Sequence, residues 1–270
     1  VINKEYNPAM LAEALCKLEG FTYAPSESIY WQHGYSTEQD FIYVTTQTLS
    51  INKSPQQYLD ELVPKWIDFC KKFHISNDYF YRTSAKDHHA GARRAWEICD
   101  SHGDIYRKHY EGLYCVGCES FLLERELVEG KCPHHGKAPA RHSEENYFFR
   151  LSKYSRQIAE HVEKSPDFLK PGSKRQELLN FLKDMEDISV SRSRSNLPWG
   201  IEVPNDPEHT MYVWFDALTN YIRVLGFDSD LHRFNAWWPG IQLCGPDNLR
   251  VQGAIWQGRL ASLGLPFTRK

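Results

Sequence analysis

The feature that most constrains the fold of this chain is a short polar stretch with two pairs of potential metal ligands, Cys115-x-x-Cys118 and Cys132-x-x-His135. The spacing within each pair lets both side chains of a tight turn face one point, and four such ligands make the tetrahedral set that zinc favours. His134 is an alternative fourth ligand, although the x-x spacing favours His135. A closed set leaves no position for a substrate, so we expect a structural zinc ion that orders a segment over about residues 110–146.

Two other interpretations of these cysteines fit less well. Cysteine often serves as a small core residue, but paired cysteines in a polar, glycine-containing stretch are not typical of a core. The chain has seven cysteines, an odd total, and no segment typical of a secretory signal. Both observations argue against a disulfide framework.

Composition narrows the possible classes of protein. At 270 residues, with 41% hydrophobic and 25% charged residues, the chain resembles an ordinary globular protein with a substantial core. No apolar run approaches the ~20 residues that cross a bilayer, so we expect no membrane contact. The net charge of -3 argues against a generally basic nucleic-acid binder, and any contact with RNA would need a local patch.

The first part of the chain shows both helical and strand patterns. Apolar residues between Met10 and Leu18 recur at helical spacing, and the run that begins at Phe41 has the composition of a strand. Ser54 followed by Pro55 predicts the start of a longer helix. Pro64 lies inside that helix and is expected to kink or split it.

The middle of the chain is predicted to be mainly helical outside the cysteine-rich stretch. One helix should end at Gly103. A second is expected from Glu144, with Phe149 on its apolar side, to the break at Ser165. The segment SKRQELLNFLKDM predicts a third helix, whose lysine and arginine residues favour a solvated face over a nucleic-acid patch.

The last part alternates between strand and helix. We expect one strand over Met211–Phe215, followed by a helix with Asp216 at the boundary, and a second over Ile241–Cys244, followed by a helix closed by Gly264. Strands that alternate with helices predict an α/β fold with a mostly parallel sheet, which places ligands beyond the carboxyl ends of its strands.

Five longer segments also follow one another in a recognisable order. They are RTSAKDHH, GDIYRKHYEGLYCVGCESFL, SEENYFFRLS, DISVSRSRSNLPWGIEVPNDPEHTMYVWFDALTNY and WWPGIQLCGPDNLRVQGAIWQGRLASLGLPF. Together they resemble the catalytic domain of methionyl-tRNA synthetases, which are class I aminoacyl-tRNA synthetases, and the bacterial and mitochondrial type in particular. The resemblance covers most of residues 55–270. It implies a Rossmann-like parallel sheet interrupted by a connective insert with a zinc knuckle.

The resemblance also implies a reaction and its partners. The family activates methionine with ATP and magnesium and transfers the aminoacyl group to initiator and elongator methionine tRNA. The implied domains are residues 1–103 and 206–270, the two halves of the Rossmann-like domain, with the connective insert at 104–205. The subtype implies the mitochondrial matrix, or a bacterial cytoplasm as the alternative.

Site residues follow from the resemblance position by position. The methionine pocket would be walled by Trp214, Ala217 and Tyr221, and the adenosine moiety would be held by Gly245 and Asp247.

Two further positions depart from the family pattern. Val251-Gln252 stands where most relatives have Phe-His, and Gln252 is assigned to the pocket. Glu38 would meet the substrate ammonium group, although its STEQDF segment replaces the family's Gly-Thr-Asp-Glu-His-Gly.

Two ATP-binding signatures of the family are not found. Its His-Ile-Gly-His is expected before the first helix, where the chain reads Tyr6-Asn7-Pro8-Ala9, and its Lys-Met-Ser-Lys-Ser would lie beyond Lys270. We therefore expect these 270 residues to form the adenylate inefficiently. Three hypotheses stay open: a ligase with segments missing from the sequence as given, an inactive homologue that serves as an RNA-binding or scaffold subunit, and a related ligase for another amino acid.

Overall fold

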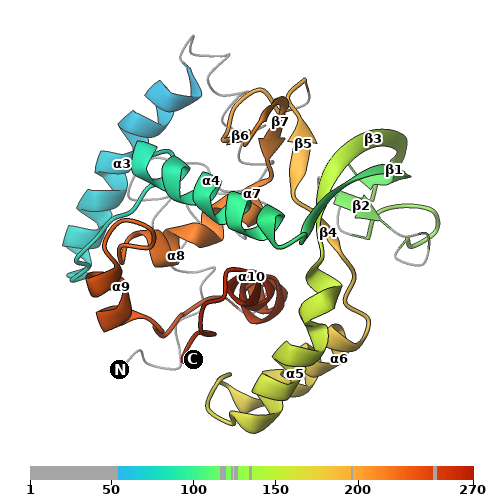
Figure 1. Cartoon of the computed structure of the whole chain (residues 1–270). Coiled ribbons are helices and arrows are strands. Elements are labelled where there is room, and N and C mark those ends of the chain that lie inside the picture. The colour runs from blue at the N-terminus through green and yellow to red at the C-terminus, as the bar shows by residue number, and fades with distance from the viewer. Residues whose placement is uncertain are drawn as a thin grey trace. The chain divides into compact units, whose positions relative to one another are not determined.

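The structure is a computed structural model that describes residues 54–115, 120–122, 124, 127–133, 136–195, 197–245 and 248–270. All of them belong to one compact unit, Thr37–Lys270 (Figure 1). The helix predicted after Met10 and the strand predicted from Phe41 lie outside the described residues. None of the described helices is long and apolar enough to span a bilayer.

Helix α3, Pro55–Lys72, begins as the sequence predicts. The Gln57 N–H donates to Ser54 Oγ at 3.2 Å, and the Ser54 N–H donates to the Gln57 side-chain oxygen at 2.9 Å. This reciprocal pair satisfies two backbone donors at the helix start. Pro64 lies inside this single helix, so of the two expected outcomes, a kink or a split, the split does not occur. A single proline removes one backbone hydrogen bond, and the capped turns on either side persist.

Helix α4, Lys86–Ser101, leads into a four-stranded antiparallel sheet of order β2-β1-β3-β4. Its strands are β1 (Ile105–Cys115), β2 (Ser120–Leu122), β3 (Ala140–Phe149) and β4 (Ile188–Ser189). Gly103 has φ +70°, a conformation that glycine adopts readily, and it ends α4 as predicted.

The helix expected from Glu144 is wrong in its first part, because residues up to Phe149 belong to β3. They pair with β1 in a continuous register from Tyr114↔Ala140 to Ile105↔Phe149, and this ladder supplies the hydrogen bonds that a helix would otherwise provide. The helical part begins after Phe149 and ends before Ser165, as predicted. It consists of the 3₁₀ turn η3 (Leu151–Tyr154) and α5 (Ser155–Lys164).

The third predicted helix is confirmed, and a second small sheet follows it. The helix is α6, Arg175–Lys183, preceded by the 3₁₀ turn η4, Gly172–Lys174. The sheet has the order β5-β7-β6 and is also antiparallel. Its strands are β5 (Ser191–Ser193), β6 (Glu202–Val203) and β7 (Asp206–Met211).

The two strands predicted near the end of the chain require correction. The first is shifted: β7 ends at Met211, and the following residues form the short helix α7, Val213–Asp216. Residues 241–244 are not a regular strand; the Gln242 N–H donates to the Lys270 carbonyl at 2.9 Å. All strand pairs in the described residues are antiparallel, so the expected parallel sheet is not among them, while the mixture of helices and strands agrees with the α/β class.

The remaining elements follow α7 in order. They are η5 (Ala217–Thr219), α8 (Asn220–Arg223), α9 (Leu231–Trp237), the π-helical turn η7 (Val251–Ile255) and α10 (Trp256–Ser262). Gly264, at φ +69°, closes α10 as predicted.

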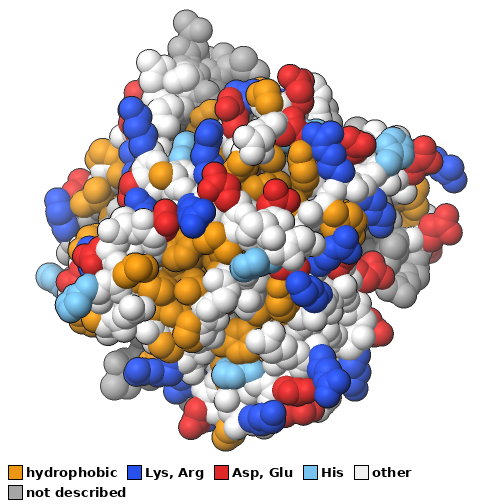
Figure 2. All heavy atoms as spheres, in the orientation of Figure 1, with side chains coloured by type: hydrophobic (Ala, Val, Ile, Leu, Met, Phe, Trp, Pro, Cys, Tyr) orange, Lys and Arg blue, Asp and Glu red, His pale blue; other side chains and the backbone are white. Residues whose placement is uncertain are grey.

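One hydrophobic core joins α5 and α6 to the elements around α10. Phe149, Ile158, Phe215 and Leu260 are all at most 1% exposed within this core. Burial of each such side chain stabilises the fold by about 1.5–3 kcal/mol. Figure 2 shows hydrophobic side chains gathered in the middle of one face, over the region of α7 to α10, with charged groups around them.

Candidate functional site

The predicted pocket wall lies on the irregular helical segment α7–η5–α8. Trp214, Ala217 and Tyr221 lie three and four residues apart, a spacing that places side chains on one face of a helix. Ala217 is 7% exposed, and the other two are half-buried. The Asn220 side-chain amide donates to the Ala217 carbonyl and supports the turn between α7 and α8.

A second element reaches this wall from the end of the chain. Gln252, in η7, donates from Nε2 to the Tyr221 hydroxyl at 3.0 Å. The Trp256 ring lies 6.0 Å from the Tyr221 ring. Burial raises the pKa of Tyr221, so its hydroxyl is protonated at neutral pH. Two of the predicted pocket residues are therefore in direct contact.

Gln252 also has an unused acceptor. Its residue is 8% exposed, and Oε1 finds no hydrogen-bond partner among the described residues. A buried oxygen without a partner costs free energy. A ligand N–H group would satisfy it.

An aromatic cluster behind the wall was not predicted. Trp238 lies 6.3 Å from Trp256, ring to ring, and stacks on Phe234 at 6.1 Å. The Trp238 indole N–H donates to the Pro266 carbonyl at 3.0 Å. The available signal in the sequence was the pair of tryptophans, Trp237-Trp238, ahead of Pro239. A tryptophan that is buried needs a hydrogen-bond acceptor for its indole N–H, which the Pro266 carbonyl supplies to Trp238.

Three buried ionisable groups lie beside the wall, and of these only Asp216 was singled out from the sequence, at the helix boundary. His88 and Arg259 are 0% exposed and Asp216 is 9% exposed. His88 Nε2 lies 3.6 Å from Asp216 Oδ1. Burial raises the pKa of Asp216 and lowers the pKa of Arg259 to about 10. The sequence offered one signal for Arg259: a charged residue at a core position of an otherwise apolar predicted helix.

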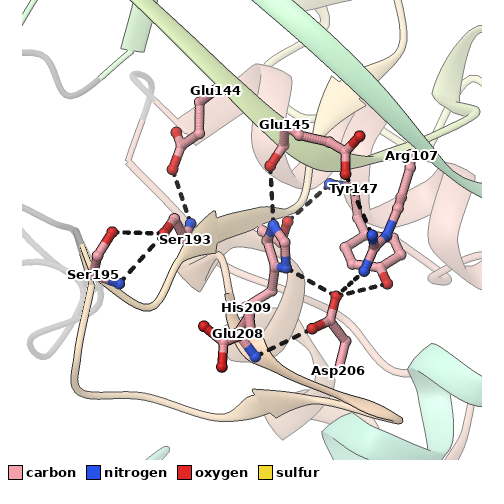
Figure 3. A network of polar contacts seen from close by, with 10 residues as sticks. Arg107, Glu144, Glu145, Tyr147, Ser193, Ser195, Asp206, Glu208 and His209 are labelled. Atoms are coloured by element: carbon pink, nitrogen blue, oxygen red, sulfur yellow. Dashed lines mark hydrogen bonds and ion pairs between the residues drawn. The ribbon is translucent and has the colours of Figure 1, made fainter.

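The strands β1 and β3 of the first sheet are tied to β7 of the second sheet by a network centred on Asp206 (Figure 3). Its carboxylate accepts from Arg107, from the Tyr147 hydroxyl at 3.0 Å and from His209 Nδ1 at 2.9 Å. His209 Nε2 lies 2.9 Å from the Glu145 carbonyl. Although burial raises the pKa of Asp206, these hydrogen bonds hold it below its usual value.

Two of the four predicted metal ligands are described. Cys115 and Cys132 are 3% and 1% exposed. Cys115 ends β1 and pairs with Ser120 of β2. The Cys132 N–H donates to the Lys137 carbonyl at 2.9 Å, and the Cys132 carbonyl accepts from Gly136 at 2.8 Å. Both cysteines thus lie where the backbone folds back on itself.

The other ligands, Cys118 and His135, lie outside the described residues, as does the alternative His134. Within the described part of the chain, no three His, Cys, Asp or Glu residues are grouped for a metal ion. The donor set that spacing predicts therefore stays a prediction, and the burial of both described thiols fits it.

The predicted nucleotide-binding residues are only partly described. Gly245 is half-buried, and its carbonyl accepts from the Asn248 N–H at 3.1 Å. This loop directly precedes η7, whose Gln252 contacts Tyr221. Asp247 and Glu38 lie outside the described residues.

Comparison with known proteins places these features in a family. The family model for "tRNA synthetases class I (M)" matches residues 42–144 and 134–270. The methionine–tRNA ligases of Caldanaerobacter subterraneus and of a Nostoc species are each 44% identical, over 80% and 81% of this chain and 34% and 42% of theirs. Methionyl-tRNA synthetase of Mycobacterium tuberculosis, solved with methionyl-adenylate, matches with TM-score 0.77 and 32% identity over 88% of this chain and 47% of that one. The chain thus spans less than half the length of these relatives.

Proposed function

Since this chain belongs to the class I tRNA synthetases of the methionine type, we propose that it binds methionine and, as part of a methionine–tRNA ligase, activates it with ATP for transfer to tRNA. The observation that carries the proposal is the hydrogen bond from Gln252 to Tyr221. It joins two of the proposed pocket residues, which come from different helical segments, and this contact supports a methionine pocket at that point.

The chemistry of the wall suits a thioether. Trp214 and Tyr221 offer aromatic surface, and sulfur–aromatic contacts contribute about 0.3–1.5 kcal/mol each. The short Ala217 side chain leaves room between them. Gln252 Oε1, which has no partner among the described residues, is available to a donor on the ligand. The wall therefore combines apolar contact with one polar group that orients the ligand.

ATP with magnesium is the proposed co-substrate, and the loop at Gly245 is its proposed contact. The position of this loop directly before η7, whose Gln252 contacts the wall at Tyr221, supports an adjacent nucleotide site. Asp247 would accept from the ribose hydroxyls, and Glu38 would meet the methionine ammonium group. In this arrangement the chain's own role is to hold the carboxylate of methionine against the α-phosphate of ATP. Holding the two reactants together lowers the entropic part of the barrier to adenylate formation.

We propose that Cys115, Cys118, Cys132 and His135 hold one structural zinc ion. When bound, zinc would order the insert and supply no step of the reaction, because four protein ligands fill its coordination. The partner proposed for the whole ligase is methionine tRNA, initiator and elongator. The mitochondrial matrix remains the proposed location.

Equilibrium dialysis with labelled L-methionine tests the pocket directly. We expect the 270-residue chain to bind methionine in preference to leucine, and Trp214→Ala to weaken binding at least 10-fold, about 1.4 kcal/mol. Trp237→Ala is the matched control, because Trp237 is 68% exposed and lies outside the wall. Equal loss in both variants would contradict the assignment.

A second assay separates the competing functions. Methionine-dependent exchange of pyrophosphate into ATP by the 270-residue chain is expected to be weak, and robust exchange would refute that expectation and identify a ligase. Binding of another amino acid with no binding of methionine would indicate a related ligase. RNA that copurifies with a chain unable to bind methionine would indicate a scaffold subunit.

A further inference from the structure

The side chain of Arg259 is the most unusual buried group outside the predicted site. It belongs to α10, whose residues from Trp256 to Leu260 are buried, and it is 0% exposed. Removal of a charge from water costs several kcal/mol unless hydrogen bonds compensate. A buried guanidinium therefore marks a place where specific contacts outweigh that cost.

Those contacts are made to the segment that carries the pocket wall. Arg259 Nη1 donates to the Phe215 carbonyl, and Nη2 donates to the Thr219 hydroxyl at 2.8 Å. Its guanidinium also lies 3.9 Å from the centre of the Phe215 ring. Phe215 precedes the 3₁₀ turn η5, and Thr219 is its last residue. The planar fork of arginine thus bridges the two ends of the turn that presents Ala217.

Two other residues of the η7–α10 stretch contact the same wall segment as Arg259. Gln252, Trp256 and Arg259 lie four and three residues apart, so they follow one face of the η7–α10 helical stretch. Gln252 holds the Tyr221 hydroxyl, and Trp256 lies against the Tyr221 ring. All three therefore contact the α7–η5–α8 segment.

The charge on Arg259 is retained at neutral pH. Burial lowers its pKa to about 10, and the nearby Cys99 and Asp216 act in the opposite direction. Asp216 in turn lies 3.6 Å from His88 Nε2. Arg259 Nε has no partner within the described part of the chain, so the two Nη contacts account for its orientation.

We propose that Arg259 is a positioning residue for the pocket wall: by fixing the η5 turn between Phe215 and Thr219, it sets the affinity for methionine without touching methionine. The methionine part of this inference rests on the function proposed above. The positioning part concerns only contacts within the chain and can be tested separately.

The test compares Arg259→Met, Arg259→Lys and a control, Leu182→Ala, in the 270-residue chain. The methionine side chain in Arg259→Met keeps much of the arginine volume but has no hydrogen-bond donors. The lysine side chain in Arg259→Lys keeps the charge and a single donor group. Leu182 is 1% exposed on α6, so its truncation destabilises the core from outside the wall. Circular dichroism and thermal melting identify the folded fraction of each variant.

Amide hydrogen exchange over residues 213–223 is the readout that needs no ligand. We expect Arg259→Met to accelerate exchange in this segment at least 10-fold more than in α4, Arg259→Lys to show a smaller increase, and Leu182→Ala to show no such preference. Uniform acceleration, or none in folded protein, would overturn the proposal.

Equilibrium dialysis then supplies the link to function. We expect the methionine Kd to rise about 10-fold in Arg259→Met and about 3-fold in Arg259→Lys, with the ATP Kd unchanged. An unchanged methionine Kd in folded Arg259→Met would overturn the proposal. Absence of methionine binding in the unsubstituted chain would refute the proposed pocket, while the exchange result would still decide whether Arg259 positions the turn.

Discussion

Replacement of Tyr221 by phenylalanine should destabilise the fold more than replacement of its partner Gln252 by leucine. The change removes only a hydroxyl, which accepts from Gln252 Nε2 at 3.0 Å. Gln252 is 8% exposed, and its Oε1 has no partner among the described residues. Tyr221→Phe therefore leaves both ends of a buried amide without a partner.

The size of the effect follows from this asymmetry. An unpaired buried donor costs about 1–3 kcal/mol, and we expect Tyr221→Phe to lower the free energy of unfolding by about 2 kcal/mol. Gln252→Leu removes the amide, and the half-buried Tyr221 hydroxyl can still reach water, so its cost should be within ~1 kcal/mol. The double variant should be more stable than Tyr221→Phe alone.

Urea unfolding followed by circular dichroism measures these differences as a double-mutant cycle. Tyr106→Phe is the matched control, because it removes one hydroxyl from a half-buried tyrosine that donates to Asp187 at 2.8 Å, away from the wall. It should leave the methionine Kd unchanged, whereas Tyr221→Phe should raise it. Additive effects of the two pocket substitutions would refute the reasoning.

Three further outcomes are expected. Burial raises the pKa of Asp104, but hydrogen bonds from Lys153, Tyr154 and Ser262 outweigh it and hold the folded-state pKa below the ordinary value of 3.8. The stability that Asp104 contributes is therefore fully present only well above pH 3.8 and is lost as pH falls through 3.8 and then through the lowered folded-state pKa. Asp104→Asn should flatten this acid limb in pH-dependent urea unfolding, and an unchanged limb would contradict it. Gly258→Ala should cost about 1–3 kcal/mol, because its Cβ would lie 2.5 Å from Leu151 Cδ1, whereas Gly172→Ala, with nothing within 4 Å, should be nearly neutral in the same assay. Elemental analysis should find about one zinc per chain, reduced by Cys132→Ser; a value near zero before substitution would exclude the metal.

Local features of the fold were predictable because they depend on residues near one another in the chain. The Ser54 cap, the glycine at Gly103 and the glycine at Gly264 each act within one helical turn, and the structure confirms all three. In these cases the side chain and the backbone group that it satisfies are only a few residues apart.

Features that depend on distant partners were not predictable in the same way. The residues from Glu144 to Phe149 fit a helical period, yet they form a strand because β1 supplies a ten-residue ladder of partners. The strand expected at Ile241–Cys244 is absent because the chain there makes isolated hydrogen bonds to its last residues. The spacing of apolar residues in a segment does not reveal which distant segment will pair with it.

The sequence by itself determined the α/β class and the family, since motif order and residue type are carried by the chain alone, and it supplied the prediction of the pocket residues. Only the tertiary structure brought Gln252 onto Tyr221, buried Arg259 beneath the wall and made Asp206 the link between the two sheets. From the sequence alone, a polar side chain is predicted to lie on the surface. Its burial becomes favourable only when folding brings acceptors from distant segments within hydrogen-bond distance.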